Sequence, residues 1–151
     1  MKSRQPANNG DNETDPGARA LFTRGLTLTA LGMTLGLALE GLLGFKTPAY
    51  LQDPLRRELF RLAHAHLTLL GMLAAVCALG LGRWRVNVTT SVSRALLAGA
   101  LLMPLGFFSG GVRHPEGDPG PGIWLVPIGA LLVLYGLSGV ILAVRPSAKT
   151  G

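Results

Sequence analysis

Residues 61–81 read RLAHAHLTLLGMLAAVCALGL, and this stretch decides the fold. After Arg61, twenty successive residues include no Asp, Glu, Lys or Arg. Because a helix rises about 1.5 Å per residue, roughly twenty residues cross the ~30 Å hydrocarbon layer of a membrane. We therefore expect residues 62–81 to span a membrane, with two histidines at the entrance of the span.

Three further segments have the same character: residues 25–45, 95–112 and 123–144. Charged residues make up 15% of the chain, whereas soluble proteins carry about 25%. The 21 glycines fit the same class, since glycine is commoner in membrane helices than in soluble ones. The sequence predicts an all-α integral membrane protein, a four-helix bundle in one domain over residues 21–146. Residues 1–20 are polar and predict a disordered tail, and residues 147–151 form a second tail.

The short connections between the spans predict how the chain enters and leaves the membrane. Asp53-Pro54 is a helix start, with a capping Asp before a proline in the first turn. Residues 113–122 are dense in glycine and proline and predict a loop. Nine of the 14 basic residues fall on the side that holds both chain ends. The positive-inside rule then predicts cytoplasmic termini in a bacterial inner membrane. This distribution accounts for the net charge of +6, and we expect no nucleic-acid partner.

Four polar side chains are expected in the outer half of the protein: Glu40, His64, His66 and His114. An ionisable residue in a membrane span is a functional candidate. Small residues accompany two of them. One stripe is Gly32, Gly36, Glu40 and Gly44, and the other is His64, Thr68, Gly71, Ala75, Ala78 and Gly82. Since small residues at such spacing let helices approach closely, we expect Glu40 and His64 to face each other across a helix seam.

His66 follows His64 by two positions, or about 200° around a helix. The two rings therefore cannot grip one metal ion from a regular helix, and we expect different surroundings for each. Either they are ligands, or they are interface residues whose polar tips reach water. The candidate cofactor-binding residues are His64, His66 and Glu40, and the candidate metal ligands are His64, His66 and His114. Glu40 can equally be a packing residue, and His114 a solvated loop residue.

The segment HAHLTLLG, residues 64–71, has the pattern H-x-H-x-x-x-x-G and follows TLGLALEGLLGF at residues 34–45. This layout resembles that of small, uncharacterised bacterial four-helix membrane proteins. The histidine segment is also similar to the HAH segment of NnrS-type membrane proteins, which are associated with haem, copper and nitric oxide stress. The resemblance covers about eight residues of HAHLTLLG. It implies that His64 or His66 ligates haem iron or copper.

Three functions are compatible with these patterns. The first is a non-enzymatic accessory or structural bundle, which joins a membrane partner or a second copy through its small-residue faces within the lipid bilayer. The second is a haem- or metal-binding redox or sensor protein. The third is an oligomeric carrier or a proton path through Glu40 and His64. The sequence contains no phosphate-binding loop and no Cys/His zinc spacing, and we interpret the one cysteine, Cys77, as a small buried hydrophobe.

Overall fold

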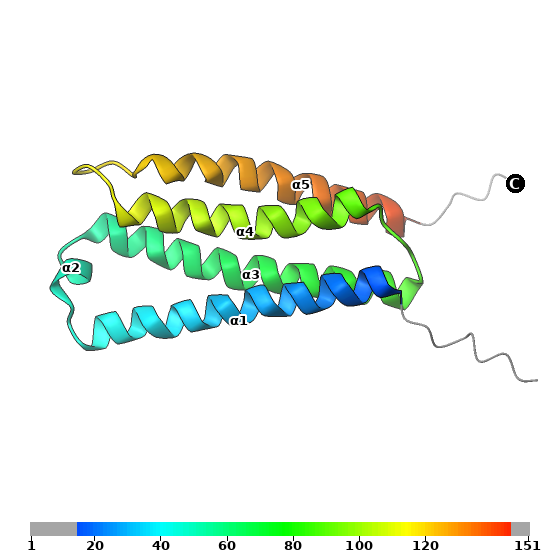
Figure 1. Cartoon of the computed structure of the whole chain (residues 1–151), viewed down its shortest axis with the longest axis horizontal. Helices are drawn as coiled ribbons and strands as arrows, with labels where there is room; N and C mark the ends of the chain where they lie inside the picture. Colours follow the sequence, from blue (N-terminus) through cyan, green and yellow to red (C-terminus); the bar gives the residue numbers. More distant parts are fainter. Residues whose placement is uncertain (1–14, 146–151) are drawn as a thin grey trace, which may run out of the picture.

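The computed structural model describes residues 15–145 and contains four long helices that alternate in direction (Figure 1). They are α1 (Pro16–Gly44), α3 (Pro54–Trp84), α4 (Thr90–Val112) and α5 (Leu125–Val144). Two short elements, α2 (Pro48–Leu51) and the 3-10 helix η2 (Pro121–Trp124), lie in the connections. All four long helices, the last counted from Pro121, are long and apolar enough to cross a membrane. The expected all-α, multi-pass membrane architecture is confirmed.

Helix α1 begins earlier than the sequence predicted. The side chain of Asp15 accepts hydrogen bonds from the backbone N–H groups of Gly17 and Ala18, at 3.1 and 3.3 Å, and Pro16 fills the first helical position. This pairing of a capping Asp with a proline starts a helix, so the predicted disordered tail is wrong for residues 16–20. The rest of that tail, residues 1–14, and the predicted tail at 147–151 lie outside the described residues.

Helix α3 begins where Asp53-Pro54 predicted. The carboxylate of Asp53 accepts a hydrogen bond from the backbone N–H of Arg56 at 2.9 Å, and Pro54 opens the helix. With 31 residues, α3 is longer than the roughly 20 that a span requires. Its first two turns, before residue 62, therefore extend beyond the apolar segment.

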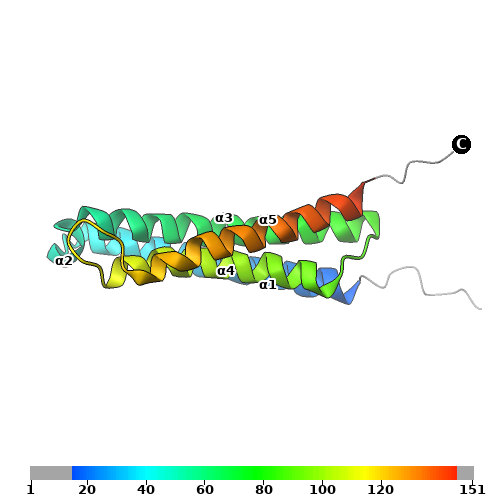
Figure 2. The same cartoon turned by 90° about the horizontal axis from the view of Figure 1, so that it is seen from above.

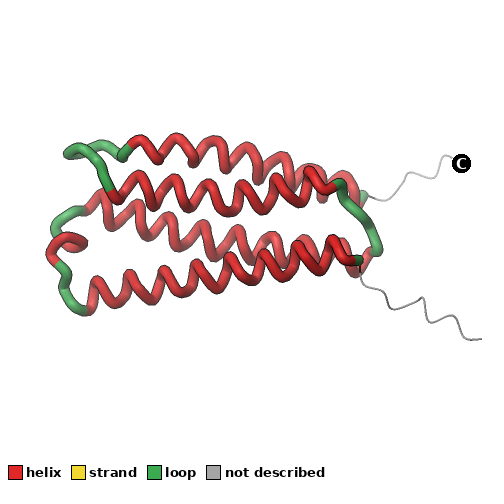
Figure 3. The backbone as a smooth tube through the Cα atoms, viewed as in Figure 1, coloured by secondary structure: helices red, strands yellow, loops and turns green. Residues whose placement is uncertain are grey.

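The four long helices form a staggered row. Helix α1 packs on α3 and α5 packs on α4, while α3 and α4 join the two pairs (Figures 1 and 2). Within residues 15–145, no Cα atom of α1 approaches one of α5 within 8 Å. Figure 3 shows the connections at the two ends of the bundle along the helix axes. We call the end with Asp15, Arg145 and the α3–α4 connection the terminal end, and the end with α2 and η2 the loop end.

Glycines let the paired helices touch backbone to backbone. A Cβ atom built on Gly25 of α1 would lie 2.7 Å from the amide nitrogen of Ala75 on α3. On α4, a Cβ built on Gly99 would lie 2.6 Å from the carbonyl oxygen of Gly129 on α5. Lipid tails are as apolar as leucine, so close van der Waals packing of small residues, rather than burial from water, holds such helices together.

Candidate functional site

His64 lies on the seam between α1 and α3, as predicted. Its Nδ1 is 2.8 Å from the carbonyl oxygen of Gly32, and since a carbonyl only accepts, Nδ1 carries the proton. The ring covers Gly36, where a built Cβ would lie 2.7 Å from the same nitrogen. The two glycines therefore form the space that admits the ring, and the hydrogen bond ties α3 to α1.

Thr29 and Thr68 continue this polar seam. The hydroxyl of Thr29 donates to the carbonyl oxygen of Gly25 at 3.1 Å and lies 3.5 Å from that of Thr68 across the seam. The hydroxyl of Thr68 donates to the carbonyl oxygen of His64 at 2.9 Å. In the described part of the chain, no buried side-chain nitrogen or oxygen lacks a hydrogen-bond partner. The polar groups of this seam thus form hydrogen bonds both within and between α1 and α3.

Glu40 does not face His64, and the prediction that the two meet across the seam is wrong. The side chain of Glu40 is exposed, and the neighbouring Leu39 is buried in its place. A four-residue repeat advances 400°, so it drifts about 40° per step. From Gly32 to Glu40 the drift is about 80°, which carries the carboxylate off the packed face. Glu40 lies about 6 Å before the end of α1 by helical rise, within reach of the headgroup layer.

His66 occupies the opposite side of α3 from His64, as the 200° separation predicted. Its Nδ1 donates to the carbonyl oxygen of Leu62, one turn earlier in the same helix, at 2.8 Å. Its ring lies against Phe107 of α4, with centroids 4.9 Å apart and planes tilted by 37°. His66 therefore packs between α3 and α4, where it bonds within its own helix.

The histidines do not converge on a common point. In both His64 and His66 the Nδ1 is engaged with a carbonyl, which leaves Nε2 as the ring nitrogen able to ligate a metal. The two rings point to different neighbouring helices, however, and Glu40 joins neither. Residues 15–145 hold no group of three His, Cys, Asp or Glu side chains arranged to bind a metal ion. This geometry does not fit a haem held by two facing histidines of one chain.

His114 joins a polar cluster at the loop end that the sequence did not predict. Its Nε2 lies 2.9 Å from Oδ2 of Asp53, and its Nδ1 lies 2.9 Å from the carbonyl oxygen of Pro115. Both partners are acceptors, so only the charged ring satisfies both hydrogen bonds. Because 8% of its side chain is exposed, the reading of His114 as a solvated loop residue is wrong.

Arg56 completes this cluster. Its Nε donates to the carbonyl oxygen of Gly111 at 3.0 Å, and its Nη1 donates to that of Ala49 at 2.9 Å. Its Nη2 lies 3.5 Å from Oδ2 of Asp53. We call Asp53, Arg56 and His114 the loop-end clasp, since it connects α2, the start of α3, the end of α4 and the following loop.

The clasp is built around a carboxylate held in its charged form. The backbone N–H of Arg56 lowers the pKa of Asp53 below its usual 3.8, the charges of His114 and Arg56 lower it further, and burial opposes them. A sequence signal existed for the capping role of Asp53, but none for its pairing with His114, which lies 61 residues further along the chain.

No protein-family model, curated protein or solved structure matches this chain.

Proposed function

We propose that this protein is a non-catalytic accessory subunit that lies in a bacterial inner membrane, with both termini in the cytoplasm. In this proposal it binds another transmembrane segment through the outer face of α1. The observation that carries the proposal is a second stripe of small residues, opposite the face that packs on α3: Thr23, Thr27, Ala30, Thr34, Ala38 and Gly41.

This stripe has the composition of a helix contact without a partner in the chain. Five of its six members are exposed, and a Cβ added at Gly41 would meet nothing within 4 Å. The hydroxyls of Thr23, Thr27 and Thr34 each donate to the carbonyl four residues earlier, at 2.9–3.0 Å. The polar groups are therefore satisfied within α1, and what remains outside is a shallow surface. Such surfaces allow close approach of a second helix.

The remaining polar residues support a binding role over catalysis. His64 and Thr29 bond across the α1–α3 seam, and His66 packs on Phe107. A proton path would require Glu40 and His64 to share a route, yet Glu40 is exposed on the flank of α1. A haem or metal role would require a second chain to supply the missing ligands.

Photo-cross-linking in cell membranes tests this proposal. A photoreactive amino acid at position 34 is expected to give a discrete protein adduct, which the substitution Ala30→Leu in the same chain should remove. The same probe at Leu134, a lipid-facing residue of α5 that is 60% exposed, serves as the matched control and should give none. Two differently tagged copies in one cell show whether the adduct is a second copy or another protein. Absence of an adduct at position 34, or an equal one at position 134, would contradict the proposal.

A further inference from the structure

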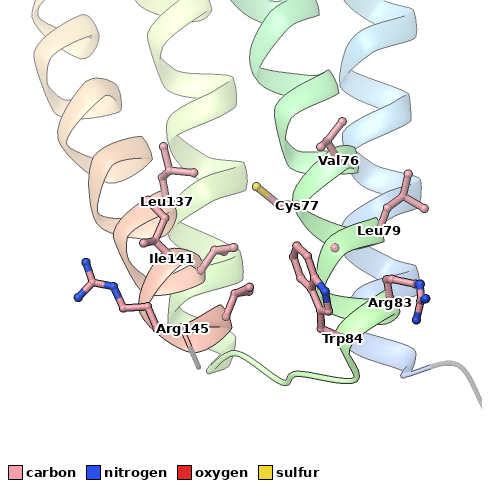
Figure 4. A pocket seen from close by; sticks show the side chains of 11 residues that line it. Val76, Cys77, Leu79, Arg83, Trp84, Leu137, Ile141 and Arg145 are labelled. Carbon is pink, nitrogen blue, oxygen red and sulfur yellow. The ribbon is translucent and has the colours of Figure 1, made fainter. Parts of the chain in front are cut away.

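A groove lies between α3 and α5 at the terminal end, far along the helices from the histidines (Figure 4). Its volume is about 730 Å³, within the range of roughly 300–1,000 Å³ that small-molecule sites occupy. Its walls are almost wholly apolar, formed by residues such as Val76, Leu137 and Ile141. The staggered row explains the groove, because α3 and α5 are each packed mainly on other helices.

Charged side chains line this groove only where it reaches the terminal end of the helices. Arg83 of α3 and Arg145, the residue that follows α5, line it, and both side chains are exposed. Figure 4 shows Trp84 between the two helices, with the Arg83 side chain directed outward from the α3 side and the Arg145 side chain directed outward from the α5 side. Trp84 is 61% exposed, and an indole at the end of a span prefers the headgroup level. The groove is thus apolar along its length, and two exposed arginines flank it at the terminal end.

The surroundings favour an anionic occupant. Among residues 15–145, the terminal end holds six arginines (Arg19, Arg24, Arg83, Arg85, Arg94 and Arg145) and a single acidic residue, Asp15. The carboxylate of Asp15 is engaged in capping α1. A guanidinium matches a phosphate group in both charge and hydrogen-bond geometry, and basic pockets between membrane helices bind anionic headgroups.

We propose that this groove binds one anionic phospholipid. An acyl chain lies between Val76 and Ile141, and the phosphate group lies at the terminal end of the groove, where the exposed side chains of Arg83 and Arg145 turn toward it. The proposal involves α3 and α5 and is independent of the stripe on α1. The six residues that follow Arg145, PSAKTG, are polar and carry Lys149, so their composition does not suit an apolar, cationic groove.

Quenching of Trp84 fluorescence tests the proposal in the full-length protein. The substitution Trp124→Phe leaves Trp84 as the single tryptophan. The protein is reconstituted in phosphatidylcholine vesicles to which one brominated lipid is added. This lipid is either phosphatidylglycerol or phosphatidylcholine, in both cases with brominated acyl chains. Each arginine near a membrane surface strengthens attraction to anionic lipid. Brominated phosphatidylglycerol is therefore expected to reach the same quenching as brominated phosphatidylcholine at a mole fraction at least roughly tenfold lower.

Two matched variants separate the groove from the general charge of this end. Arg83→Gln/Arg145→Gln is expected to abolish the preference for phosphatidylglycerol. Arg24→Gln/Arg94→Gln removes the same charge from exposed positions of the same end, outside the groove, and should retain the preference. Equal quenching by both lipids would show only a general lipid shell and would overturn the proposal. A preference that survives Arg83→Gln/Arg145→Gln would place the lipid elsewhere and also overturn it.

Cys77 gives an independent readout, since it lines the groove and is the only cysteine of the chain. In detergent micelles, phosphatidylglycerol is expected to slow maleimide modification of Cys77 several-fold, whereas phosphatidylcholine should not. The slowing should be absent in Arg83→Gln/Arg145→Gln. Protection that is complete before any lipid is added would show that another occupant, such as the chain's own terminus or a second copy, fills the groove, and the proposal would fail.

Discussion

The substitution Gly71→Ala tests whether backbone contact holds α1 on α3. A Cβ atom at Gly71 would lie 2.6 Å from the amide nitrogen of Thr29 and 2.8 Å from the carbonyl oxygen of Gly25. Ordinary contacts of a Cβ atom begin near 3.4 Å, so the two helices would have to separate by about 0.8 Å at the nearest atom. The two nearest atoms belong to the backbone of α1, and no rotation of a side chain moves them away.

The expected cost follows from two opposing terms. Overpacking a close contact costs about 1–3 kcal/mol, while replacing glycine by alanine within a helix gains about 0.5–1 kcal/mol. Gly82 is the matched control, because it lies on the same helix and a Cβ there would meet nothing within 4 Å. The helix-propensity gain is common to both variants, so Gly71→Ala should be less stable than Gly82→Ala by about 1–3 kcal/mol.

The free energy of unfolding is measured in dodecylmaltoside micelles with rising mole fractions of dodecyl sulfate, followed by far-ultraviolet circular dichroism. Gly71→Ala should unfold at a lower dodecyl sulfate fraction than Gly82→Ala. Equal midpoints would refute the reasoning. A second refutation would be full recovery of stability in Gly71→Ala/Thr29→Ala, because that result would assign the clash to the Thr29 hydroxyl rather than to the backbone of α1.

Three further predictions follow from other parts of the molecule. His64→Ala should lower the unfolding free energy more than His66→Ala, by roughly 1 kcal/mol, because only His64 bonds to another helix; a larger loss at His66 in the same micelle titration would contradict this. The pKa of Asp53 is lowered on folding, so its carboxylate stabilises the fold above its unfolded pKa and this contribution disappears as pH falls below about 4. The difference in melting temperature between wild type and Asp53→Ala should therefore shrink from about pH 6 to about pH 3, and a constant difference would exclude a role for that charge. Reporter fusions within residues 85–89 should report the cytoplasm and those within residues 113–120 the outside, and the reverse pattern would invert the proposed orientation.

The spans were predictable because hydropathy and end signals are local. Strongly apolar runs of about twenty residues located the four helices, and Asp53-Pro54 located the start of α3. The same signal at Asp15-Pro16 marks the start of α1, although the polar composition of the first twenty residues by itself favours a disordered tail. The packed face of α3 was also predictable through Gly71, Ala75 and Ala78, because their steps of four and three follow the 3.5-residue period of two supercoiled helices.

Contacts between distant residues were not predictable, because they depend on how the helices cross. The repeat of four that includes Glu40 looked like a seam, but only the position of α3 showed that Leu39 is buried instead. His114 and Asp53 come into contact only because the loop after α4 folds over the start of α3.

The sequence by itself determined that four apolar helices cross a membrane, where α3 begins and which face of α3 packs. These properties depend on residues within one or a few turns of each other, so spacing and composition suffice. Only the tertiary structure decided the exposure of Glu40, the loop-end clasp and the groove between α3 and α5. Each of these depends on the separation and rotation of whole helices, which are set by the contacts of small residues such as Gly25, Gly71 and Gly99.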